Sequence, residues 1–524
     1  MVIEKIKISN FKRYYGSHMI NFNEKYNVII GNNESGKSTI FMALDLVLSG
    51  SRNKIETIGL ESLFNKQIIN EFMSGERKIK DLPEISIEIY LKYTGIETLN
   101  GKNNSDKVEC DGIKLNIIPN PDYSKIINQL LLSENAIFPF EYYKCSFTTF
   151  HDDYYTSYNK PLKYTLINES NMSNDYAIKD YIINMYSNIA SEELKNELNN
   201  SFRKIKQDFN IKDLKTINDE LDGFQFGLSN LAKNSLENNL TLYDNDISLF
   251  DKGTGTQCLL KILSTLGKKT KDLDLILIEE PENHLSDTNM KKMINSILSE
   301  NNNSQLIVTT HNSMICSRIG LKNIIALSDE KVIAKEFDKI SSETVRFFMK
   351  NTSNSILNFI LSKRVILVEG SAEYILLEKF YEINNTLKPE EDNVSIISVS
   401  GLSFERYLEV AKELKIKVAV ITDNDGNYKE KITNKYKDYE KIDNISIYAD
   451  NVDENKTFEI SVFNLNKEWL ENNNITKQAD IKKFMLNNKA ENAFRILEKL
   501  NSKDVNGNFV IPQYIKDAIS WIKE

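Results

Sequence analysis

A glycine-rich segment near the N-terminus has the residue types and the spacing to bind phosphate groups. It reads Gly-Asn-Asn-Glu-Ser-Gly-Lys-Ser from Gly31 to Ser38, which matches the phosphate-binding pattern of two glycines followed by Lys and Ser in full. Glycines let backbone N–H groups turn toward phosphate oxygens, Lys37 neutralises negative charge, and the Ser38 hydroxyl is a ligand for Mg²⁺. The nucleotide-binding residues predicted from this pattern are Asn32, Asn33, Glu34, Ser35, Gly36, Lys37, Ser38 and Thr39.

A second apolar run ends in acids, as an ATP-hydrolysing site of this kind requires. Residues 275–282 read Leu-Ile-Leu-Ile-Glu-Glu-Pro-Glu. We expect Glu279 to belong to the Mg²⁺ shell and Glu280 to polarise the water that attacks ATP. Alone, such a run could be a plain strand followed by a solvated turn. Together with the phosphate-binding loop it favours an ATPase.

Another group of acids lies in the C-terminal third of the chain. Glu369 follows an apolar run and Glu373 comes four residues later, with Gly370 allowing a tight turn between strand and helix. Asp423 and Asp425 follow a further apolar run at a spacing of two, so both project to one side of an extended chain. Hard oxygen ligands at adjacent strand ends suit Mg²⁺ or Mn²⁺, which activates water for phosphodiester cleavage. We therefore predict a metal site, with Glu369 also essential to catalysis.

Two other interpretations of the Asp423–Asp425 segment were considered. A calcium loop of the EF-hand type needs Gly at its sixth position and Glu at its twelfth, where this sequence has Tyr428 and Asn434. The calcium interpretation therefore fails. A plain turn rich in Asp and Asn remains open for this segment alone.

The elements that must position these residues follow from the hydrophobic pattern. A helix is expected at residues 40–48, directly after the phosphate-binding loop, and residues 84–93 alternate as a half-exposed strand does. The other runs predicted as strands are residues 2–9, 26–30, 273–278, 305–309, 365–368, 394–399 and 418–422. The last three, separated by helical stretches, indicate a second parallel α/β unit.

Domain boundaries are expected where composition and periodicity change. Residues 171–245 are rich in Asn, Lys, Glu and Leu with helical spacing, which indicates a helical insertion and possible dimerisation element; an ordinary helical layer is the alternative. We expect ATPase parts at residues 1–170 and 246–350, joined through a polar segment to a nuclease domain at residues 351–524.

Composition excludes some classes of protein. The 524 residues include 41% hydrophobic and 27% charged residues, which is typical of a globular chain of about three domains. A net charge of −9 argues weakly against a nucleic-acid partner, but a basic groove can lie on an acidic protein. Four distant cysteines indicate neither a disulfide framework nor a zinc site. Without a signal peptide or a long apolar stretch, the chain is expected in the cytoplasm.

Two further segments resemble parts of ABC-type ATPases. Lys252–Gln257 resembles the signature loop, which implies that Gly253 and Gln257 contact a nucleotide bound by a partner subunit. His311, which follows a predicted strand, matches the switch histidine that contacts the γ-phosphate. Residues 1–345 thus resemble the ABC-type heads of RecF/SMC-like ATPases, and the resemblance implies dimers. The segment after the acidic strand reads His284-Leu-Ser-Asp287, which departs from the usual pattern.

The C-terminal acids resemble the Toprim signature, Glu-Gly-x-x-Glu followed by Asp-x-Asp-Gly. Lys456–Glu459 looks like the later acidic element of OLD-family Toprim domains, so Glu459 is a plausible fifth ligand. Lys489 matches their C-terminal lysine, which implies that it stabilises charge in the transition state; a solvated helix lysine is the alternative. The order of an ABC-type P-loop head with a helical insertion and then a Toprim domain is the layout of the OLD family, shared by the nuclease subunits of Gabija systems.

The resemblance implies an ATP- and metal-dependent endonuclease that acts on DNA, often in bacterial defence against phage. It also implies a homodimer or higher oligomer, with a helicase-like or other defence protein as a possible partner. The competing hypothesis is an ABC-type scaffold or motor whose Toprim domain binds nucleic acid or a partner without cutting. A topoisomerase would need a nucleophilic tyrosine domain, which is not recognisable in this sequence. Whether ATP activates or restrains cutting is open.

Overall fold

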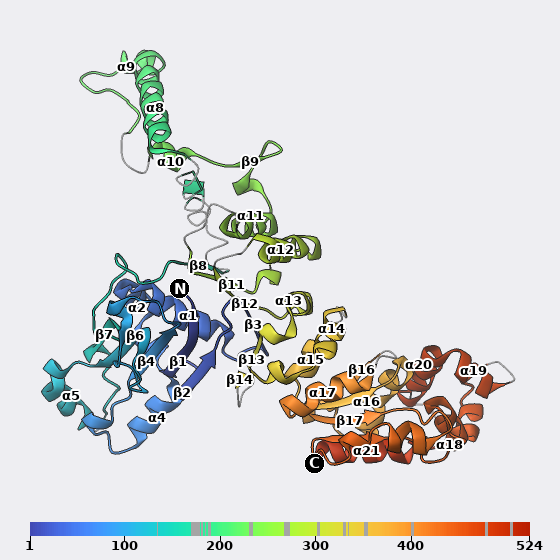
Figure 1. The fold of residues 1–524 in the computed structure, drawn as a ribbon. Coiled ribbons are helices and arrows are strands. Elements are labelled where there is room, and N and C mark those ends of the chain that lie inside the picture. The colour runs from blue at the N-terminus through green and yellow to red at the C-terminus, as the bar shows by residue number, and fades with distance from the viewer. Residues whose placement is uncertain are drawn as a thin grey trace. The chain divides into compact units, whose positions relative to one another are not determined.

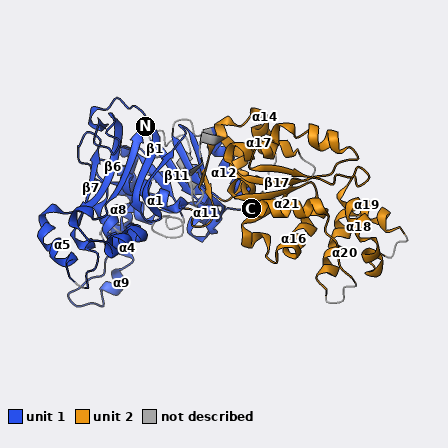
Figure 2. Cartoon of the chain, turned by 90° about the horizontal axis from the view of Figure 1, so that it is seen from below, with its two compact units in different colours: residues 1–28, 36–310 blue, residues 29–35, 311–524 orange. Residues whose placement is uncertain are grey.

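The computed structural model describes most of the chain and divides it into two units (Figures 1 and 2). The described residues are 1–133, 135–168, 179, 182, 183, 185, 186, 190–229, 234–266, 273–283, 285–300, 304–327, 332, 333, 335–350, 355–399, 403–476, 480–502 and 507–524. Unit 1 comprises residues 1–28 and 36–310, and unit 2 comprises residues 29–35 and 311–524.

Unit 1 contains an antiparallel sheet with strand order β2-β1-β4-β6-β5, and β7 also pairs with β6. Its strands are β1 (Ile3–Phe11), β2 (Tyr14–Asn21), β4 (Ile85–Leu91), β5 (Asn100–Gly101), β6 (Cys110–Pro119) and β7 (Tyr143–Thr149). Alternate residues such as Ile6, Ile87 and Ile113 are fully buried, because successive side chains of a strand point to opposite faces. Helix α1 (Lys37–Ser49) contacts β4 and β6.

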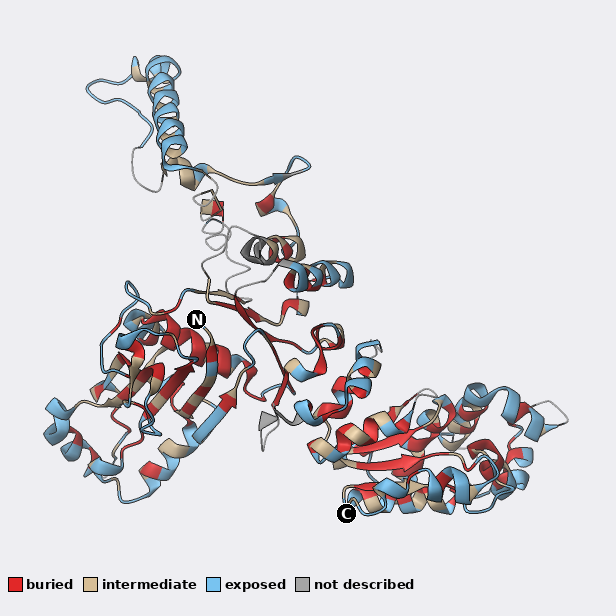
Figure 3. Cartoon of the chain, viewed as in Figure 1, coloured by how far each residue is buried: buried red, intermediate tan, exposed pale blue. Residues whose placement is uncertain are grey.

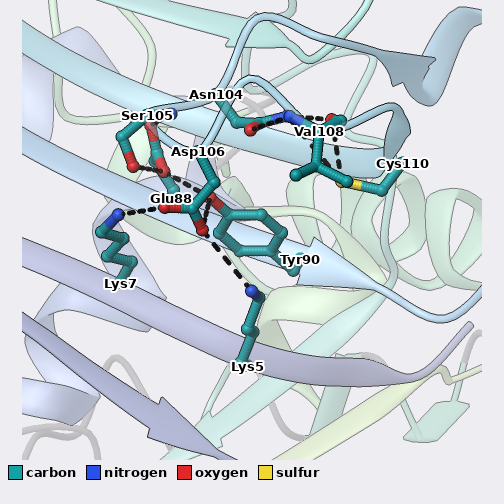
Figure 4. Close-up of polar contacts among 9 residues, drawn as sticks. All are labelled: Lys5, Lys7, Glu88, Tyr90, Asn104, Ser105, Asp106, Val108 and Cys110. Atoms are coloured by element: carbon teal, nitrogen blue, oxygen red, sulfur yellow. Dashed lines mark hydrogen bonds and ion pairs between the residues drawn. The ribbon is translucent and has the colours of Figure 1, made fainter.

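The loop before β6 contacts polar side chains of β1 and β4, as Figure 4 shows. The carboxylate of Glu88 accepts hydrogen bonds from the backbone N–H and the hydroxyl of Ser105 and from the hydroxyl of Tyr90, each at 2.8 Å. Lys7 donates to Asp106 at 2.6 Å. The prediction that residues 84–93 form a half-exposed strand was therefore wrong, because this loop buries the polar face of β4 as well.

A second, six-stranded sheet includes β3 (Tyr26–Gly31), whose first three residues belong to unit 1 and whose last three belong to unit 2. Strand β11 (Leu275–Glu279) lies between β8 (Tyr164–Ile167) and β12 (Gln305–Thr309), and both pairings are parallel. Strand β3 is next to β12, with the N–H of Leu306 donating to the carbonyl of Lys25 at 2.8 Å. The predicted runs 26–30, 273–278 and 305–309 are therefore strands of one sheet, in which the parallel strands β8, β11 and β12 end at one edge.

The helices of unit 1 surround these sheets and extend beyond them. They include α2 (Arg52–Ile58), α3 (Leu60–Leu63), α4 (Lys66–Ser74), α5 (Ser124–Leu131), α8 (Glu192–Lys212), α9 (Lys215–Asn218), α10 (Leu236–Asn239), α11 (Thr254–Leu266) and α12 (Asp287–Glu300); a short hairpin joins β9 (Tyr243–Asp244) and β10 (Ile247–Ser248). The structure describes all of α8, and none of its side chains is buried (Figure 3). Residues 171–178, the start of the predicted helical insertion, lie outside the described residues.

Unit 2 is built on a parallel sheet with strand order β16-β15-β17-β18. Its strands are β15 (Arg364–Val368), β16 (Val394–Ser398), β17 (Lys417–Ile421) and β18 (Ile445–Tyr448). The helices are α16 (Ser371–Asn385), α17 (Phe404–Leu414), α18 (Phe458–Asn472), α19 (Ile481–Asn487), α20 (Lys489–Leu500) and α21 (Gln513–Lys523). The second parallel α/β unit predicted from the sequence is confirmed, and β18 is a strand that the prediction missed.

Unit 2 also includes the chain that follows the ATPase strands. Strand β13 (Ile324–Leu327) lies beside β3 and pairs antiparallel with β14 (Val332–Ile333), while α13 (Ser313–Ile319), α14 (Ser342–Lys350) and α15 (Ser355–Leu361) follow the chain toward the second sheet. The buried rings of Phe348 and Phe359 lie edge-on against Tyr407 of α17, with centroids 5.0 and 5.2 Å away. Helix α14 is therefore packed on the second sheet's own helix layer.

A carboxylate reinforces this packing. Glu409 of α17 accepts hydrogen bonds from the hydroxyl of Ser341 at 3.0 Å, from the backbone N–H of Ser341 and from the hydroxyl of Thr344. Burial acts to raise the pKa of Glu409, but these hydrogen bonds outweigh it and hold the pKa below its usual value of 4.5. The start of α14 is thus held on α17 by an ionised side chain.

None of the helices within the described residues is long and apolar enough to span a bilayer.

We predict that Glu409→Ala destabilises unit 2 at neutral pH by about 1–3 kcal/mol, because it removes a charged acceptor of several hydrogen bonds. Since the pKa of Glu409 is lowered in the folded state, its contribution is present above the unfolded pKa and is lost as the pH falls through the folded pKa. Urea unfolding followed by tryptophan fluorescence reports on unit 2 alone, because Trp469 and Trp521 are the only tryptophans.

The difference between Glu409→Ala and wild type should shrink between pH 7 and pH 4. Glu405→Ala, one turn earlier on the same helix and exposed, is the matched control and should change stability little at either pH. Equal unfolding midpoints for Glu409→Ala and wild type at pH 7 would contradict this account of α14.

Candidate nucleotide and metal sites

The phosphate-binding loop joins β3 to α1 in the order that the sequence predicts. Gly36 is the residue before the first turn of α1 and has a φ of 100°, and Glu34 also has a positive φ of 65°. Asn32, Asn33, Glu34 and Ser38 are exposed, whereas Lys37 is only 5% exposed. The exposed loop backbone at the N-terminus of a helix suits phosphate binding, because the helix dipole and the N–H groups both favour an anion there.

The atoms around Gly31 leave no space for a side chain at this position. A Cβ atom at this position would lie 2.3 Å from Oγ of Ser35 and 2.9 Å from the carbonyl oxygen of Leu327. Both distances are too short for a real contact, and one of the atoms belongs to the backbone. Glycine is therefore required at the first position of the loop, since any side chain would displace Ser35 or the strand β13.

The acids predicted at the end of β11 lie beside the loop lysine. Glu279 ends the strand, and the carboxylate Oε1 of Glu280 is 3.9 Å from Nζ of Lys37. Burial lowers the pKa of Lys37, although Glu279, Glu280 and Glu282 act in the opposite direction. Glu280 has a positive φ of 40°, and its N–H donates to the carbonyl of Thr309 at 3.0 Å. This strained backbone is held by the neighbouring strand, which orients the side chain that the sequence assigns to water activation.

The signature-like loop lies at the start of α11. Gly253 precedes the helix, and a Cβ at this position would meet no atom within 4 Å. Gln257 is buried, and its side-chain nitrogen donates to the carbonyl oxygens of Leu249 and Lys252 at 2.9 Å each. Sequence reasoning missed this anchoring of the loop by Gln257. The predicted contact of Gly253 and Gln257 with a partner's nucleotide stays a prediction.

The predicted switch histidine, His311, lies two residues after the end of β12. His311 is exposed and comes after Thr310, whose hydroxyl donates to Glu282 at 2.8 Å. Asn312 then caps α13 by accepting from the N–H of Met314 at 2.8 Å. The role of His311 at the γ-phosphate stays a prediction. His284, where the sequence departs from the usual pattern, lies outside the described residues.

The acids of the second group meet at the C-terminal edge of the parallel sheet in unit 2. Val368 and Ile421 pair across β15 and β17, so Glu369 and Thr422 leave the sheet side by side. The Thr422 hydroxyl donates to Glu369 at 3.4 Å. Glu373 follows in the first turn of α16 and is buried. Thr422 was missed from the sequence, although it stands directly between the apolar run and Asp423.

Mutual repulsion and burial dominate the electrostatics of this edge. Burial is the largest cause that raises the pKa of Glu373 to about 7, and the charges of Glu459 and Glu369 add to it. Burial, followed by the charges of Glu373 and Glu369, raises the pKa of Asp423 to about 8. The backbone N–H of Phe458 opposes this shift by donating to Asp423 at 2.8 Å. These mutual effects on the pKa values indicate that the carboxylates lie close to one another.

Glu459 and Lys489 form an ion pair at the predicted site. Nζ of Lys489 is 3.1 Å from Oε2 of Glu459, whose side chain is 1% exposed. Burial acts to lower the pKa of Lys489, but the charge and hydrogen bond of Glu459, together with the charges of Asp423 and Glu373, outweigh it and raise the pKa above the usual 10.5. Apart from this ion pair, neither carboxylate oxygen of Glu459 accepts a hydrogen bond from the described residues. Lys489 is 49% exposed, yet it faces the acids instead of standing alone in solvent.

Asp425 is the exposed member of the group. It has a positive φ of 51°, and its carboxylate lies 3.2 Å from Nζ of Lys431. Among the described residues, no three His, Cys, Asp or Glu side chains form a group that could hold a metal ion as they stand. The chemistry of the donors nevertheless fits Mg²⁺ or Mn²⁺, because buried carboxylate oxygens of Glu373 and Glu459 lie at one sheet edge. We conclude that the donor set fits a divalent metal.

The chain matches two protein families, which together account for both groups of acids. Residues 1–316 match the family described as AAA ATPase domain, and residues 360–425 match the family described as Overcoming lysogenization defect protein-like, TOPRIM domain. The first match covers more than half of the 524 residues. These matches confirm the predicted fold class, a P-loop ATPase part followed by a C-terminal Toprim domain with a parallel sheet, and the predicted resemblance to the OLD family.

Individual relatives agree with the family matches. Endonuclease GajA of Bacillus cereus strain HuB5-5 is 23% identical over 519 residues, covering 81% of this chain and 74% of the relative. The Old nuclease of Escherichia phage P2 is 24% identical over 197 residues, covering 34% of each chain. Among solved structures, a crystal structure of the SmcHead bound to the C-winged helix domain of ScpA covers 64% of this chain and 97% of that chain, with 18% identity and a TM-score of 0.34.

Gly31→Ala should lower the affinity for ATP by about tenfold or more, because the new methyl group displaces Ser35 or the β13 backbone and distorts the loop. Binding of a fluorescent ATP analogue measures the effect. Gly227→Ala is the matched control, since a Cβ at that position meets its nearest neighbour at an ordinary 3.6 Å. Unchanged nucleotide binding by Gly31→Ala would show that the loop is not the nucleotide site.

The raised carboxyl pKa values predict an unusual dependence of stability on pH in the metal-free protein. Between the usual carboxyl pKa values and about 8, the folded state binds more protons at Glu373 and Asp423 than the unfolded state does. The free energy of unfolding therefore decreases as the pH rises through this window. Glu373→Gln removes one of these titrations and the associated repulsion, so we expect the variant to be more stable than wild type at pH 8.5, by on the order of 1 kcal/mol.

Urea unfolding in the presence of EDTA at pH 5.5, 7 and 8.5 provides the measurement. Glu382→Gln on the same helix is the control. The Lys379 ammonium lowers the pKa of Glu382, so the change in unfolding free energy at pH 8.5 should have the opposite sign. A Glu373→Gln variant that loses stability equally at all three pH values would mean that Glu373 is not held against neighbouring negative charges.

Proposed function

Since the chain belongs to the AAA ATPase domain family and carries an OLD-like TOPRIM domain, we propose that it is a DNA endonuclease that depends on a divalent metal and is gated by ATP. The two families imply the use of ATP and of a divalent metal in general; Mg²⁺ or Mn²⁺ is the proposed ion. The observation that carries the proposal is the cluster of carboxylates at the end of β15 and β17, with the raised pKa values of Glu373 and Asp423. Buried acids that repel one another are arranged to bind a cation.

In the ATPase part, each proposed role follows from the position of the residue. The loop Asn32–Thr39 would bind the triphosphate, with Lys37 on its terminal phosphates and Ser38 on Mg²⁺. Glu279 would complete the Mg²⁺ shell, and Glu280 would orient the attacking water. Support comes from the 3.9 Å approach of Glu280 to Lys37, which puts the strand's acids beside the loop.

Other residues of the ATPase part would act between subunits. Gly253 at the exposed start of α11 would contact a nucleotide held by a second copy, while Gln257 holds the loop in shape from within. His311 would sense the γ-phosphate. This arrangement requires a homodimer or a larger oligomer, and the exposed helix α8, with apolar side chains such as Ile205 and Phe209 in solvent, is a candidate dimerisation element.

In the Toprim part, Glu369, Glu373, Asp423, Asp425 and Glu459 would hold the metal, which when bound activates water and stabilises the leaving oxygen of a phosphodiester. Thr422 orients Glu369 through its hydroxyl. Lys489 is paired with Glu459, and its ammonium would offset negative charge on the phosphate that is cleaved.

The proposed substrate is DNA, and the proposed setting is defence against phage in the bacterial cytoplasm. Support comes from the relatives, which are named Endonuclease GajA and Old nuclease. A helicase-like or other defence protein is a proposed partner. The net charge of −9 requires that any DNA-binding surface be local.

Plasmid cleavage by the purified full-length protein tests the proposal. With Mg²⁺ or Mn²⁺ present, wild type should nick or linearise the plasmid, and Glu369→Ala should cut at least roughly 100-fold more slowly, because a metal ligand at the reacting phosphate is lost. Lys37→Ala should retain cutting but lose its response to ATP, which gives the sign of the coupling. Glu378→Ala, further along α16, is the control that should cut as wild type does.

A wild-type protein that hydrolyses ATP but leaves every DNA substrate intact would refute the endonuclease. The chain would then be an ATPase scaffold or motor whose Toprim domain binds nucleic acid or a partner without cutting it.

A further inference from the structure

Asn424 stands between the two aspartates of the Toprim site and is 1% exposed. Its side-chain nitrogen donates to the carbonyl oxygens of Asp450 at 2.7 Å and Val452 at 2.9 Å. Its side-chain oxygen accepts from the N–H of Gly426 at 2.8 Å. The amide therefore uses both its donor and its acceptor functions in bonds to backbone groups of two separate loops.

These bonds determine the path of the chain that carries the acids. The bond from Gly426 N–H closes a tight turn across Asp425, where Asp425 and Gly426 both have positive φ, 51° and 81°. A positive φ is disfavoured for Asp in an isolated chain, so the turn needs such a bond to hold it. Asp423 and Asp425 consequently leave the loop in directions that Asn424 fixes.

Asp450, whose carbonyl receives Asn424, links this turn to the helix that carries Glu459. One oxygen of its carboxylate accepts from the N–H of Val452 at 3.0 Å, and the other accepts from Ser461 at 2.7 Å and from Asn455 at 3.0 Å. Ser461 and Glu459 share the first turns of α18. The turn with the aspartates and the helix with Glu459 are thus joined through two side chains, Asn424 and Asp450.

A third contact completes the same arrangement. The N–H of Phe458, the first residue of α18, donates to Asp423 at 2.8 Å, and the N–H of Asp425 donates to the carbonyl of Lys456 at 3.2 Å. The turn and the start of α18 therefore hold each other at both ends of the Asp423–Asp425 segment. Removing Asn424 would leave these two contacts, and the bond from the N–H of Tyr428 to Asp453 at 2.8 Å, to hold the turn against α18 and the segment before it.

We propose that Asn424 is a positioning residue, which holds Asp423 and Asp425 in register with Glu459 so that the three acids can bind one divalent metal centre. The inference rests on the proposed function, since it concerns the same site. It goes beyond that function because it assigns metal affinity to a residue that is not itself a ligand. Outer residues of this kind typically contribute 10–100-fold to metal affinity.

A matched control separates positioning from ordinary structural support. Asn444 also donates from its side-chain nitrogen to two carbonyl oxygens, those of Ala411 at 3.1 Å and Ile416 at 2.6 Å. It precedes β18, at the opposite end of that strand from Asp450. Asn424→Ala and Asn444→Ala therefore remove comparable hydrogen bonds, but only the first is next to the acids.

The experiment measures Mn²⁺ binding to the full-length protein without nucleotide, by electron paramagnetic resonance of free Mn²⁺, for wild type, Asn424→Ala, Asn444→Ala and Glu369→Ala. Urea unfolding followed by tryptophan fluorescence is recorded for the same proteins. We expect Asn424→Ala to bind Mn²⁺ at least about tenfold more weakly than wild type. Asn444→Ala should bind Mn²⁺ as wild type does, while both Asn variants should lower the unfolding midpoint.

Asn424→Ser is the second variant, should Asn424→Ala fail to fold. Its hydroxyl can still accept from the N–H of Gly426 but cannot donate to both carbonyls, so its Mn²⁺ affinity should fall to an intermediate value. Mn²⁺ binding that is equal to wild type in the Asn424 variants, with Glu369→Ala impaired, would overturn the positioning role alone. Mn²⁺ binding that is equal in wild type and Glu369→Ala would overturn the proposed metal site, and with it this inference.

Discussion

Carboxylates that are buried side by side repel one another, and the second half of this chain is organised around that repulsion. Parallel strands end at the same edge, so Glu369 and the segment after β17 meet there without any special loop. Glu373 and Glu459 each lie in the first turn of a helix, where the positive end of the helix dipole stabilises a negative charge. The fold thus offsets part of the repulsion with helix ends, and what remains is expressed in the raised pKa values of Glu373 and Asp423.

The site in the ATPase part is also built around a buried charge, but there the charge is positive. Lys37 is buried at the start of α1, and burial lowers its pKa although the acids at the end of β11 act against the shift. In the proposed function, a triphosphate with Mg²⁺ would supply both signs of charge, the anion to Lys37 and the cation to Glu279. In each half of the chain, a ligand of known chemistry would therefore balance the charges of the site.

The sequence predicted those features that depend on local pattern. Apolar runs that end in acids, together with glycines at Gly31 and Gly370, were sufficient to locate β3, β11, β15 and β17 and the residues that follow them. It did not predict features that depend on contacts distant in sequence. Glu88 was expected on a half-exposed strand because nothing in its own segment indicates that Ser105 will cover it. The bond from Gln257 to the carbonyl of Leu249, eight residues earlier, was also missed, and the predicted contact of Gln257 with a nucleotide stays a prediction.

Contacts between distant segments also bear on how nucleotide binding could affect metal binding. The sequence indicates a polar helix-linker segment between residues 335 and 355, and the helix α14 within it is packed on α17 through Phe348 and Tyr407 and is held there by Glu409. His311 and everything after it belong to the same compact unit as the Toprim sheet. If His311 contacts a γ-phosphate, as we propose, the histidine belongs to the same compact unit as Glu369 and Asp423, so the nucleotide and the metal would both act on that unit. The packing of α14 on α17 is compatible with either sign of coupling, because it fixes which of these elements move together and leaves the direction to the ligand.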